Sequence, residues 1–437
     1  LQTIRSVHMY GATLGPADRA GGNNGIGPYI TGGTPGFVAP NRLVGDHLET
    51  TVAGIRLQML YVPSEAESEI AVYLPDQRIL LSAEVVQDHT FPNLYTIRGA
   101  RYRDPVRWVR SLDALRALDA DEMVLQHGPP VSGRAEVARV LTLYRDQIQF
   151  VHDQTIRYMN KGLTPAELAE TVKLPPALAD ERPWAREFYG TVKHSVRNIY
   201  GGNVGWFAGD PVELDPTPRV EAARRLVALM GGRASVLAAA GRAFTSGDEQ
   251  FAAELATFLV RIDTADMEAR HLKAAAFRRR GYAQRNASWR NYYLVSAMEL
   301  DGQVPEALYV RRAGTMLGSA LRGLPADTQV ACLPPRLKAE EVLAETLVVG
   351  IRYVDGGEEF RLELRRGVLE VSRRPLADAA FVIEVTRETL GAVLAGAPAS
   401  DALDAGTLAV VGDVAQAKRF FAWFEQPFTT KPEVVVR

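Results

Sequence analysis

The chain has 437 residues, of which 47% are apolar and 23% charged, with a formal net charge of −2; these values are typical of a globular protein with about three domains. The balanced charge gives no electrostatic basis for binding nucleic acid or an anionic membrane surface. A single cysteine, Cys332, excludes an intrachain disulfide, and without an apolar run of about 18 residues the sequence predicts no integral membrane segment.

The first 40 or so residues are rich in glycine and proline, with runs at 21–28 and 31–36. Such runs cannot hold a regular element for long, so we expect residues 1–40 to form loop. They match no phosphate-binding loop, because no Gly-Lys-Ser/Thr follows, and they lack the strand and helix of a dinucleotide-binding fold. The expected loop either lines a cleft or lies on the surface as a mobile segment.

The following residues show the alternation of β-structure. Strand-like runs cover 51–61 and 70–74, and a hairpin turn at 74–77 leads into a third run at 79–83. Asp104, followed by proline, then begins a helix. Strand, helix and strand in this order predict an α/β domain.

Acidic residues and a histidine follow three of the apolar runs. Glu65 lies in the turn after the first run, Glu84 closes the third, and His127 closes a further run at 123–127. A strand that ends in a carboxylate presents an oxygen ligand at the edge of a sheet, so the three residues predict a partial zinc or manganese site. The alternative is that the carboxylates are solvated loop residues and the histidine lies on the surface.

From residue 132 to about 300 the periodicity is helical. One long amphipathic run covers 135–158, and Thr164, followed by proline, is a predicted helix N-cap. Gly247 and Gly281 lie 34 positions apart, the length of a tetratricopeptide-like helical hairpin. Because two imperfect copies do not make a solenoid, we predict a helical domain that is able to pair with itself.

The sequence pattern changes again at about residue 325, where prolines mark a domain boundary. Strand-like runs are separated by short turns at 355–357 and 365–367, and helical runs follow at 386–394 and 414–424. These features predict a third domain, small and of the α+β class.

Short motifs in a fixed order give the chain a specific resemblance. They are Ser64-Glu65-Ala66-x-Ser68-Glu69, Glu84, Leu94-Tyr-Thr-x-Arg98-Gly99-Ala100, Arg103-Asp-Pro105, Gln126-His127, Lys193-His194, Gly205-Trp-Phe207 and Trp289-Arg-Asn-Tyr-Tyr-Leu294. The chain resembles, over nearly its whole length, the metallo-β-lactamase-type (class III) alkylsulfatases. These are zinc enzymes that hydrolyse alkyl sulfate esters such as dodecyl sulfate.

The resemblance implies three domains. Residues 1–135 would be the C-terminal half of an α/β metallo-β-lactamase-like catalytic domain, a partial αββα sandwich, and residues 136–320 an all-α dimerisation domain with tetratricopeptide-like hairpins. Residues 325–437 are similar, in pattern rather than motif, to sterol-carrier-protein-2-like α+β domains, which enclose an apolar tunnel. This domain would either collect the substrate's apolar tail, at about 0.8 kcal/mol per buried methylene, or only stabilise the helical domain.

The resemblance also assigns roles at the metal site. Glu84 and His127 would be zinc ligands, and Glu65 would bind or orient a metal-bridging water in a site of two zinc ions per subunit. Two ions would lower the pKa of that water, so that hydroxide is available near neutral pH.

Four further residues are candidates for handling the substrate. Arg98 offers a planar fork of donors to a sulfate, Asn93 and Tyr189 would add contacts to it, and His194 would assist the leaving alkoxide. Three of them have a structural alternative: a salt bridge with Asp104 for Arg98, a turn position for Asn93, and a packed or surface position for His194.

One departure from the family is large. Its principal ligands lie in an HxHxDH motif, and no two of the seven histidines of this chain are within ten positions of each other. We therefore expect the first half of the catalytic domain to be absent from this chain. The alternatives are that it is supplied by a separate chain, or that the protein is a truncated, metal-free relative.

The function implied is zinc-dependent hydrolysis of an alkyl sulfate to alcohol and inorganic sulfate by a homodimer. The alternatives are a non-catalytic lipid-binding scaffold and a different hydrolase on the same framework, acting on phosphate esters or thioesters. The resemblance favours a periplasmic or secreted location and leaves a cytoplasmic one open.

Overall fold

The protein consists of two units, each with its own core. The computed structural model describes residues 2–18, 40–307, 310, 318, 320–426 and 433–436. The first unit includes Arg42–Val304 and Glu433–Arg437, and the second includes Pro305–Pro432. The glycine-rich runs at 21–28 and 31–36, for which the sequence predicts loop, lie outside the described residues.

The N-terminal segment differs from the loop that its composition predicts. Gln2–Met9 form helix α1, because the glycine-rich sequence begins only at Gly11 and nothing before it breaks a helix. The helix packs on α11 (Ala287–Leu300). His8 Nε2 lies 2.9 Å from Glu299 Oε2 on α11, and both side chains are only 2% exposed.

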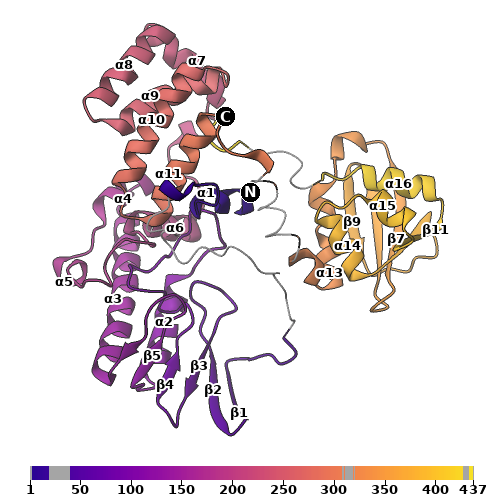
Figure 1. Ribbon diagram of the computed structural model, residues 1–437, viewed down its shortest axis with the longest axis horizontal. Helices are drawn as coiled ribbons and strands as arrows, with labels where there is room; N and C mark the ends of the chain where they lie inside the picture. The colour runs from indigo at the N-terminus through magenta and orange to yellow at the C-terminus, as the bar shows by residue number, and fades with distance from the viewer. Residues whose placement is uncertain are drawn as a thin grey trace. The chain divides into compact units, whose positions relative to one another are not determined.

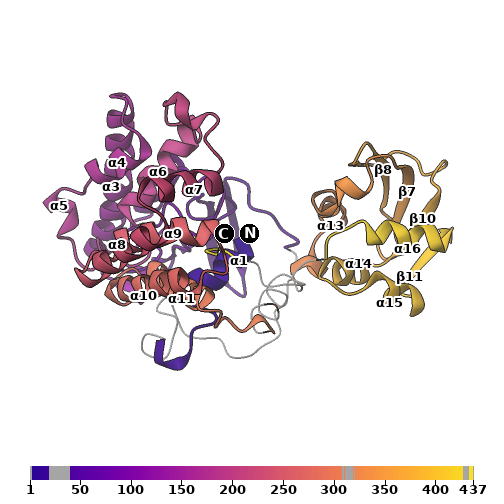
Figure 2. The same cartoon turned by 90° about the horizontal axis from the view of Figure 1, so that it is seen from above.

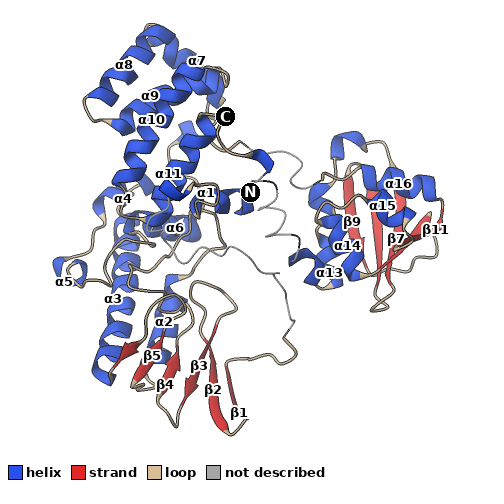
Figure 3. Cartoon of the chain, in the orientation of Figure 1, coloured by secondary structure: helices blue, strands red, loops and turns tan. Residues whose placement is uncertain are grey.

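The first unit contains a six-stranded sheet in the order β1-β2-β3-β4-β5-β6 (Figure 3). Its strands are β1 (His47–Val52), β2 (Ile55–Tyr61), β3 (Ile70–Leu74), β4 (Ile79–Leu81), β5 (Glu122–Val124) and β6 (Val131–Ser132). All neighbouring pairs are antiparallel except β4 and β5, which are parallel. Strands β2, β4 and β5 therefore run in the same direction, and their carboxyl ends meet at one edge of the sheet.

Both faces of this sheet are apolar. One face contributes Leu80 and Met123 to the core beneath α2 (Pro105–Arg116) and α3 (Arg134–Met159). On the other face the pairing register aligns Met59, Val72, Leu81 and Val124 in one row across four strands. Leu81 and Val124 are each 38% exposed. A sheet with two apolar faces is typical of one that packs on both sides.

Helices make up the rest of the first unit (Figure 1). They are α4 (Pro165–Thr171), α5 (Pro176–Ala179), α6 (Val192–Val204), α7 (Arg219–Leu229), α8 (Arg233–Thr245), α9 (Glu249–Ile262) and α10 (Met267–Ala283), together with α1, α2, α3 and α11. The predicted N-caps are confirmed: the Asp104 side chain accepts from the first backbone amides of α2, and Thr164 and Glu167 form a capping box at α4. No helix in the described ranges combines the length and apolarity needed to cross a membrane.

Helices α8, α9, α10 and α11 pack consecutively, each on the next (Figure 2). The glycines that suggest a 34-residue repeat are not equivalent in the structure. Gly247 has φ +86° in the turn between α8 and α9, whereas Gly281 lies inside α10, where an added Cβ would come within 2.9 Å of Leu294. The spacing therefore reflects a turn in one place and close helix packing in the other.

One core extends across the predicted boundary between the catalytic and helical domains. It runs from Val62 after β2, through Trp108 on α2 and Tyr144 on α3, to Ile199 on α6. The helix α3 packs both on α2 and on α6. The boundary near residue 135 therefore falls inside one structural unit, and the three-domain division stays a prediction.

The second unit is an α+β structure. Its five-stranded sheet has the order β11-β10-β7-β8-β9, and only the β10–β7 pair is parallel. The elements are β7 (Thr346–Tyr353), β8 (Glu359–Arg365), β9 (Val368–Ser372), β10 (Phe381–Val385) and β11 (Leu408–Gly412), with α13 (Ala326–Ala331), α14 (Arg387–Leu394), α15 (Ala399–Asp404) and α16 (Val414–Ala422). The meander β7-β8-β9 is found where the sequence predicts it, whereas β10, β11 and α15 have no counterpart in the prediction.

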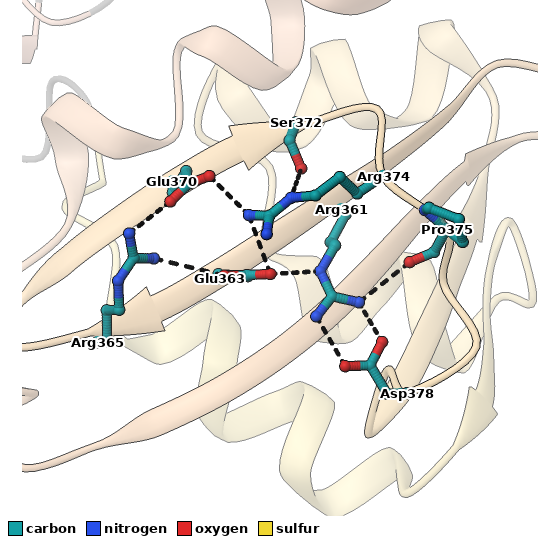
Figure 4. A network of polar contacts seen from close by, with 8 residues as sticks. All are labelled: Arg361, Glu363, Arg365, Glu370, Ser372, Arg374, Pro375 and Asp378. Atoms are coloured by element: carbon teal, nitrogen blue, oxygen red, sulfur yellow. Dashed lines mark hydrogen bonds and ion pairs between the residues drawn. The ribbon is translucent and has the colours of Figure 1, made fainter.

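The sheet of the second unit has one apolar and one charged face. Phe360, Leu362 and Leu364 of β8 lie in the core, while the residues between them lie in a network of ion pairs (Figure 4). This network consists of Arg361, Glu363, Arg365, Glu370, Arg374 and Asp378. Three cations and three anions face one another in this network, so its formal charges balance.

Residues 433–436, assigned by the sequence to the third domain, pack in the first unit. The backbone amides of Val434 and Val435 each donate to Glu299 Oε1 at 2.7 Å. Lys273 Nζ on α10 donates to Val435 O at 3.1 Å, and Val436 is 1% exposed. Burial lowers the pKa of Lys273 to about 8, and the positive charge of Arg261 adds to this effect.

We expect Lys273→Met to remove part of the alkaline pH dependence of stability. Between pH 8 and 10.5 the unfolded chain keeps a proton on this lysine that the folded chain has released, so the wild-type free energy of unfolding rises as the pH increases through this interval. Urea unfolding at a series of pH values measures the slope. Lys161→Met, at an exposed position of the same unit, is the control, and a slope that persists unchanged in Lys273→Met contradicts the assignment.

Candidate active site

The direction of the strands brings three predicted ligands to one edge of the sheet. Glu65 follows β2, Glu84 follows β4 and His127 follows β5, and these are the three strands that run the same way. All three residues line one cavity of about 270 Å³. The convergence expected from the strand ends is therefore observed.

Two of the predicted substrate-binding residues line the same cavity. They are Arg98 and Tyr189, and Tyr10, which follows α1, also lines it. The Arg98 Nε is buried, and among the described residues it has no hydrogen-bond partner. No ion pair between Arg98 and Asp104 is found in the described part of the chain, so the guanidinium is not held by the structural alternative.

A buried ion pair fixes Glu65. Arg103 Nη2 donates to Glu65 Oε1 at 2.6 Å, and the two side chains are 4% and 6% exposed. The Tyr189 hydroxyl donates to the same oxygen at 3.3 Å. Burial raises the pKa of Glu65, and the charge of Arg103 opposes that rise. The second oxygen, Oε2, is buried and has no hydrogen-bond partner among the residues described.

The second carboxylate, Glu84, faces the imidazole. His127 Nε2 lies 2.5 Å from Glu84 Oε1, and the two side chains are 51% and 29% exposed. Two groups that are each able to ligate a metal thus point their donor atoms at each other on the open side of the cavity.

Glu69 joins the two segments that carry the carboxylates. One of its oxygens accepts from the Ser64 hydroxyl, and the other accepts from the backbone amide of Glu84. The side chain is 8% exposed, and burial raises its pKa to about 7. Glu69 therefore sets the position of the loop after β2 relative to the turn after β4.

The two hydrogen bonds of Asn93 with Gln87 and Arg103 are made by its backbone. Its backbone amide donates to Gln87 Oε1 at 2.8 Å, and its carbonyl accepts from Arg103 Nη1 at 2.5 Å. The side chain is 2% exposed and lies within hydrogen-bonding reach of the Tyr189 hydroxyl. Its predicted contact with a substrate stays a prediction, because the residue is not part of the cavity wall.

His194 lies elsewhere. It lines a second cavity with Trp289, and its ring centroid is 4.9 Å from that of the indole. Burial, with a smaller effect of the positive charge of Arg197, lowers the pKa of His194 to about 4. The imidazole is therefore neutral at pH 7 and carries no imidazolium proton for a leaving group. The geometry does not bring His194 to the carboxylates.

Sequence reasoning missed three residues of the site. Arg103 and Glu69 occur in the motifs quoted for the resemblance, but nothing in their spacing shows that one pairs with Glu65 and the other holds the amide of Glu84. Tyr10 belongs to a segment interpreted as loop. In each case the partner is distant in the sequence or depends on the direction of a turn.

The donor chemistry of these residues is compatible with a metal centre but does not complete one. Glu65 has an orphaned buried oxygen, and Glu84 and His127 are adjacent on the cavity wall. Across the described ranges, however, no group of three or more His, Cys, Asp or Glu side chains has the geometry to hold an ion. The residues fit part of a ligand set.

Comparisons with known proteins identify the family. Models of the alkyl sulfatase dimerisation domain and the alkyl sulfatase C-terminal domain match residues 164–303 and 315–430. The chain is 51% identical to a linear primary-alkylsulfatase of Pseudomonas sp. (strain ATCC 19151), over 84% of this chain and 71% of that protein. The chain belongs to the alkylsulfatase family. The resemblance seen in the motifs is thereby confirmed.

Other alkylsulfatases are similar over most of this chain. An alkyl/aryl-sulfatase of Saccharomyces cerevisiae is 34% identical over 90% of the chain and 60% of its own length. The structure of a stereoselective inverting sec-alkylsulfatase, Pisa1 from Pseudomonas sp., superposes with a TM-score of 0.88 at 31% identity, over all of this chain and 69% of that one. The chain thus spans between about three fifths and seven tenths of these alkylsulfatases.

We expect Arg103→Met to destabilise the first unit by about 3–5 kcal/mol, because it leaves the Glu65 carboxylate buried without its partner. Denaturant unfolding measures the loss. The matched control is Arg101→Met, whose side chain is 93% exposed and should change stability by no more than about 0.5 kcal/mol. The double variant Arg103→Met with Glu65→Gln should recover part of the loss, and equal losses for Arg103→Met and Arg101→Met would refute the role of the pair.

Proposed function

We propose that this protein hydrolyses alkyl sulfate esters to an alcohol and inorganic sulfate. The observation that carries the proposal is one cavity whose wall contains two carboxylates, an imidazole and a guanidinium, namely Glu65, Glu84, His127 and Arg98. Among the described residues this guanidinium has no ion-pair partner. The names of the related proteins, which are linear primary and secondary alkylsulfatases, support this substrate class.

We propose further that the protein binds two zinc ions per subunit, and that Glu65, Glu84 and His127 supply some of the ligands. The orphaned Glu65 Oε2 and the facing donors of Glu84 and His127 support this assignment. The remaining ligands are expected from the HxHxDH motif of the family, which this sequence does not contain. When bound, zinc lowers the pKa of a water molecule so that it ionises near pH 7.

The protein side chains would bind and orient the ester. Arg98 supplies donors to the sulfate oxygens. Its buried Nε, which has no hydrogen-bond partner within the part of the chain that the structure describes, supports that role. The Tyr189 hydroxyl, now bonded to Glu65 at 3.3 Å, is placed to contact a bound sulfate. Arg103, which also lines this cavity, keeps Glu65 in position through their ion pair.

We also propose the finer architecture that the resemblance implies. The apolar row Met59, Val72, Leu81 and Val124 supports a sandwich, because this face needs a second sheet to cover it. The match of residues 164–303 to a dimerisation domain supports a homodimer formed through the helices. The second unit would be sterol-carrier-protein-2-like.

We expect Arg98→Ala to raise KM for an alkyl sulfate by about ten- to hundredfold, since charge-assisted hydrogen bonds contribute about 1.5–3 kcal/mol. Steady-state kinetics with dodecyl sulfate measure the change. Arg101→Ala, at an exposed position on the same segment, is the control. An unchanged KM in Arg98→Ala would remove Arg98 from the sulfate site.

We expect His127→Ala to abolish both turnover and zinc occupancy of the intact protein, because it removes an imidazole ligand. Metal analysis and release of inorganic sulfate are the two readouts, and His47→Ala, at a 48% exposed histidine, is the control. About two zinc ions per wild-type subunit favour the enzyme, and none favours the lipid-binding scaffold. A panel of sulfate esters, phosphate esters and thioesters decides between hydrolase classes, and normal turnover by His127→Ala would defeat the metal assignment.

A further inference from the structure

A second cavity of the first unit is built from aromatic and aliphatic side chains. It measures about 320 Å³ and is lined by Ile97, His194, Trp289, Tyr292 and Tyr293. None of these residues carries a carboxylate, a guanidinium or an ammonium group. A volume of this size is at the lower end of the range for pockets that bind small molecules.

The histidine of this cavity is uncharged at neutral pH. Its ring packs against the Trp289 indole with centroids 4.9 Å apart, and the Tyr95 ring meets it edge-on at 6.1 Å. Since burial holds the pKa of His194 at about 4, the imidazole is a neutral aromatic surface there. The wall is therefore suited to an apolar ligand and poorly suited to an anion.

Two separate segments connect this cavity with the candidate active site. The first is the turn that contains Ile97 and Arg98: consecutive side chains line the aromatic cavity and the active-site cavity respectively. One turn of the backbone therefore contributes a side chain to each of the two cavities.

The second connection is the start of α11. Asn286 Nδ2 donates to the carbonyl oxygen of Tyr189 at 3.0 Å. The backbone amide of Ala287 donates to the carbonyl oxygen of Phe188, also at 3.0 Å. Phe188 and Tyr189 line the active-site cavity, and Trp289, in the first turn of α11, lines the aromatic one. The same hydrogen-bonded corner therefore holds walls of both cavities.

We propose that the aromatic cavity binds the alkyl chain of the sulfate ester and sets the preference for chain length, with Trp289 as the main specificity-determining residue. This inference rests on the proposed function and extends it to the apolar end of the substrate. A sulfate ester has one end that requires donors and one that must leave water. The two cavities, which meet the same turn at residues 97–98 and the same hydrogen-bonded corner, offer these two environments.

The test compares linear alkyl sulfates from hexyl to dodecyl. In the wild type, kcat/KM should rise by about fourfold for each added methylene that the cavity buries. In Trp289→Ala this dependence on chain length should flatten, and Trp289→Phe should restore part of it. Trp206→Ala, at a 72% exposed tryptophan, should keep the wild-type dependence. If Trp289→Ala does not fold, Ile97→Ala addresses the same wall, and an unchanged dependence in the folded variants overturns the proposal.

A binding measurement separates this proposal from the proposed function. Straight-chain 1-octanol should shift the NMR resonances of the His194 ring in the wild type and not in Trp289→Ala, whereas inorganic sulfate should leave them unchanged. Octanol-dependent shifts without hydrolysis of any sulfate ester would uphold the cavity and overturn the enzymatic function. Hydrolysis of a sulfate ester without any octanol-dependent shift of the His194 resonances would uphold the enzymatic function and overturn the assignment of the aromatic cavity.

Discussion

The buried ion pair between Arg103 and Glu65 holds the candidate active site together. Arg103 donates to Glu65 in the loop after β2 and to the carbonyl of Asn93 in the segment that carries Arg98. Its own carbonyl accepts from Asn198 of α6 at 3.3 Å, and the next residue caps α2. Arg103 and the residue after it thus connect the sheet edge, the segment that carries Arg98 and two helices. Burying the two charges costs desolvation free energy, and the contacts that these elements make with Arg103 offset that cost.

The sequence predicts where the strands of the site end because apolar runs, turns and caps are local signals. Apolar runs, turns and caps show that β2 and β4 end before Glu65 and Glu84, and the crossover through α2 makes β5 parallel to β4. The same reasoning cannot find Arg103 or Glu69, whose roles depend on how two turns lie against each other. It also places His194 with the catalytic residues, since a lone histidine in a matching motif carries no information about which cavity it faces.

The two sheets of this protein show how one alternation pattern leads to different requirements. In the second unit, strand β8 alternates apolar residues with charged ones, and the charged face neutralises itself through Arg361, Glu363 and their neighbours. In the first unit, β3 is apolar at successive positions, so that Ala71 lies in the core while Val72 lies on the other face. The first sheet therefore has apolar residues on both faces, whereas the second sheet has one apolar and one charged face. The sequence shows that the two strands differ in their alternation of apolar and charged residues. Only the pairing register shows which of these residues share a face of each sheet.

The return of residues 433–436 to α10 and α11 makes the second unit an insertion within the first. Its two chain ends are fastened by the same fold, through Val304 on one side and Glu299 and Lys273 on the other. If the inserted unit melts, the surrounding fold has to close a longer loop, and that entropic cost grows only with the logarithm of loop length. Unfolding of the second unit therefore costs the first unit little stability, and on heating the two units are able to unfold in separate steps.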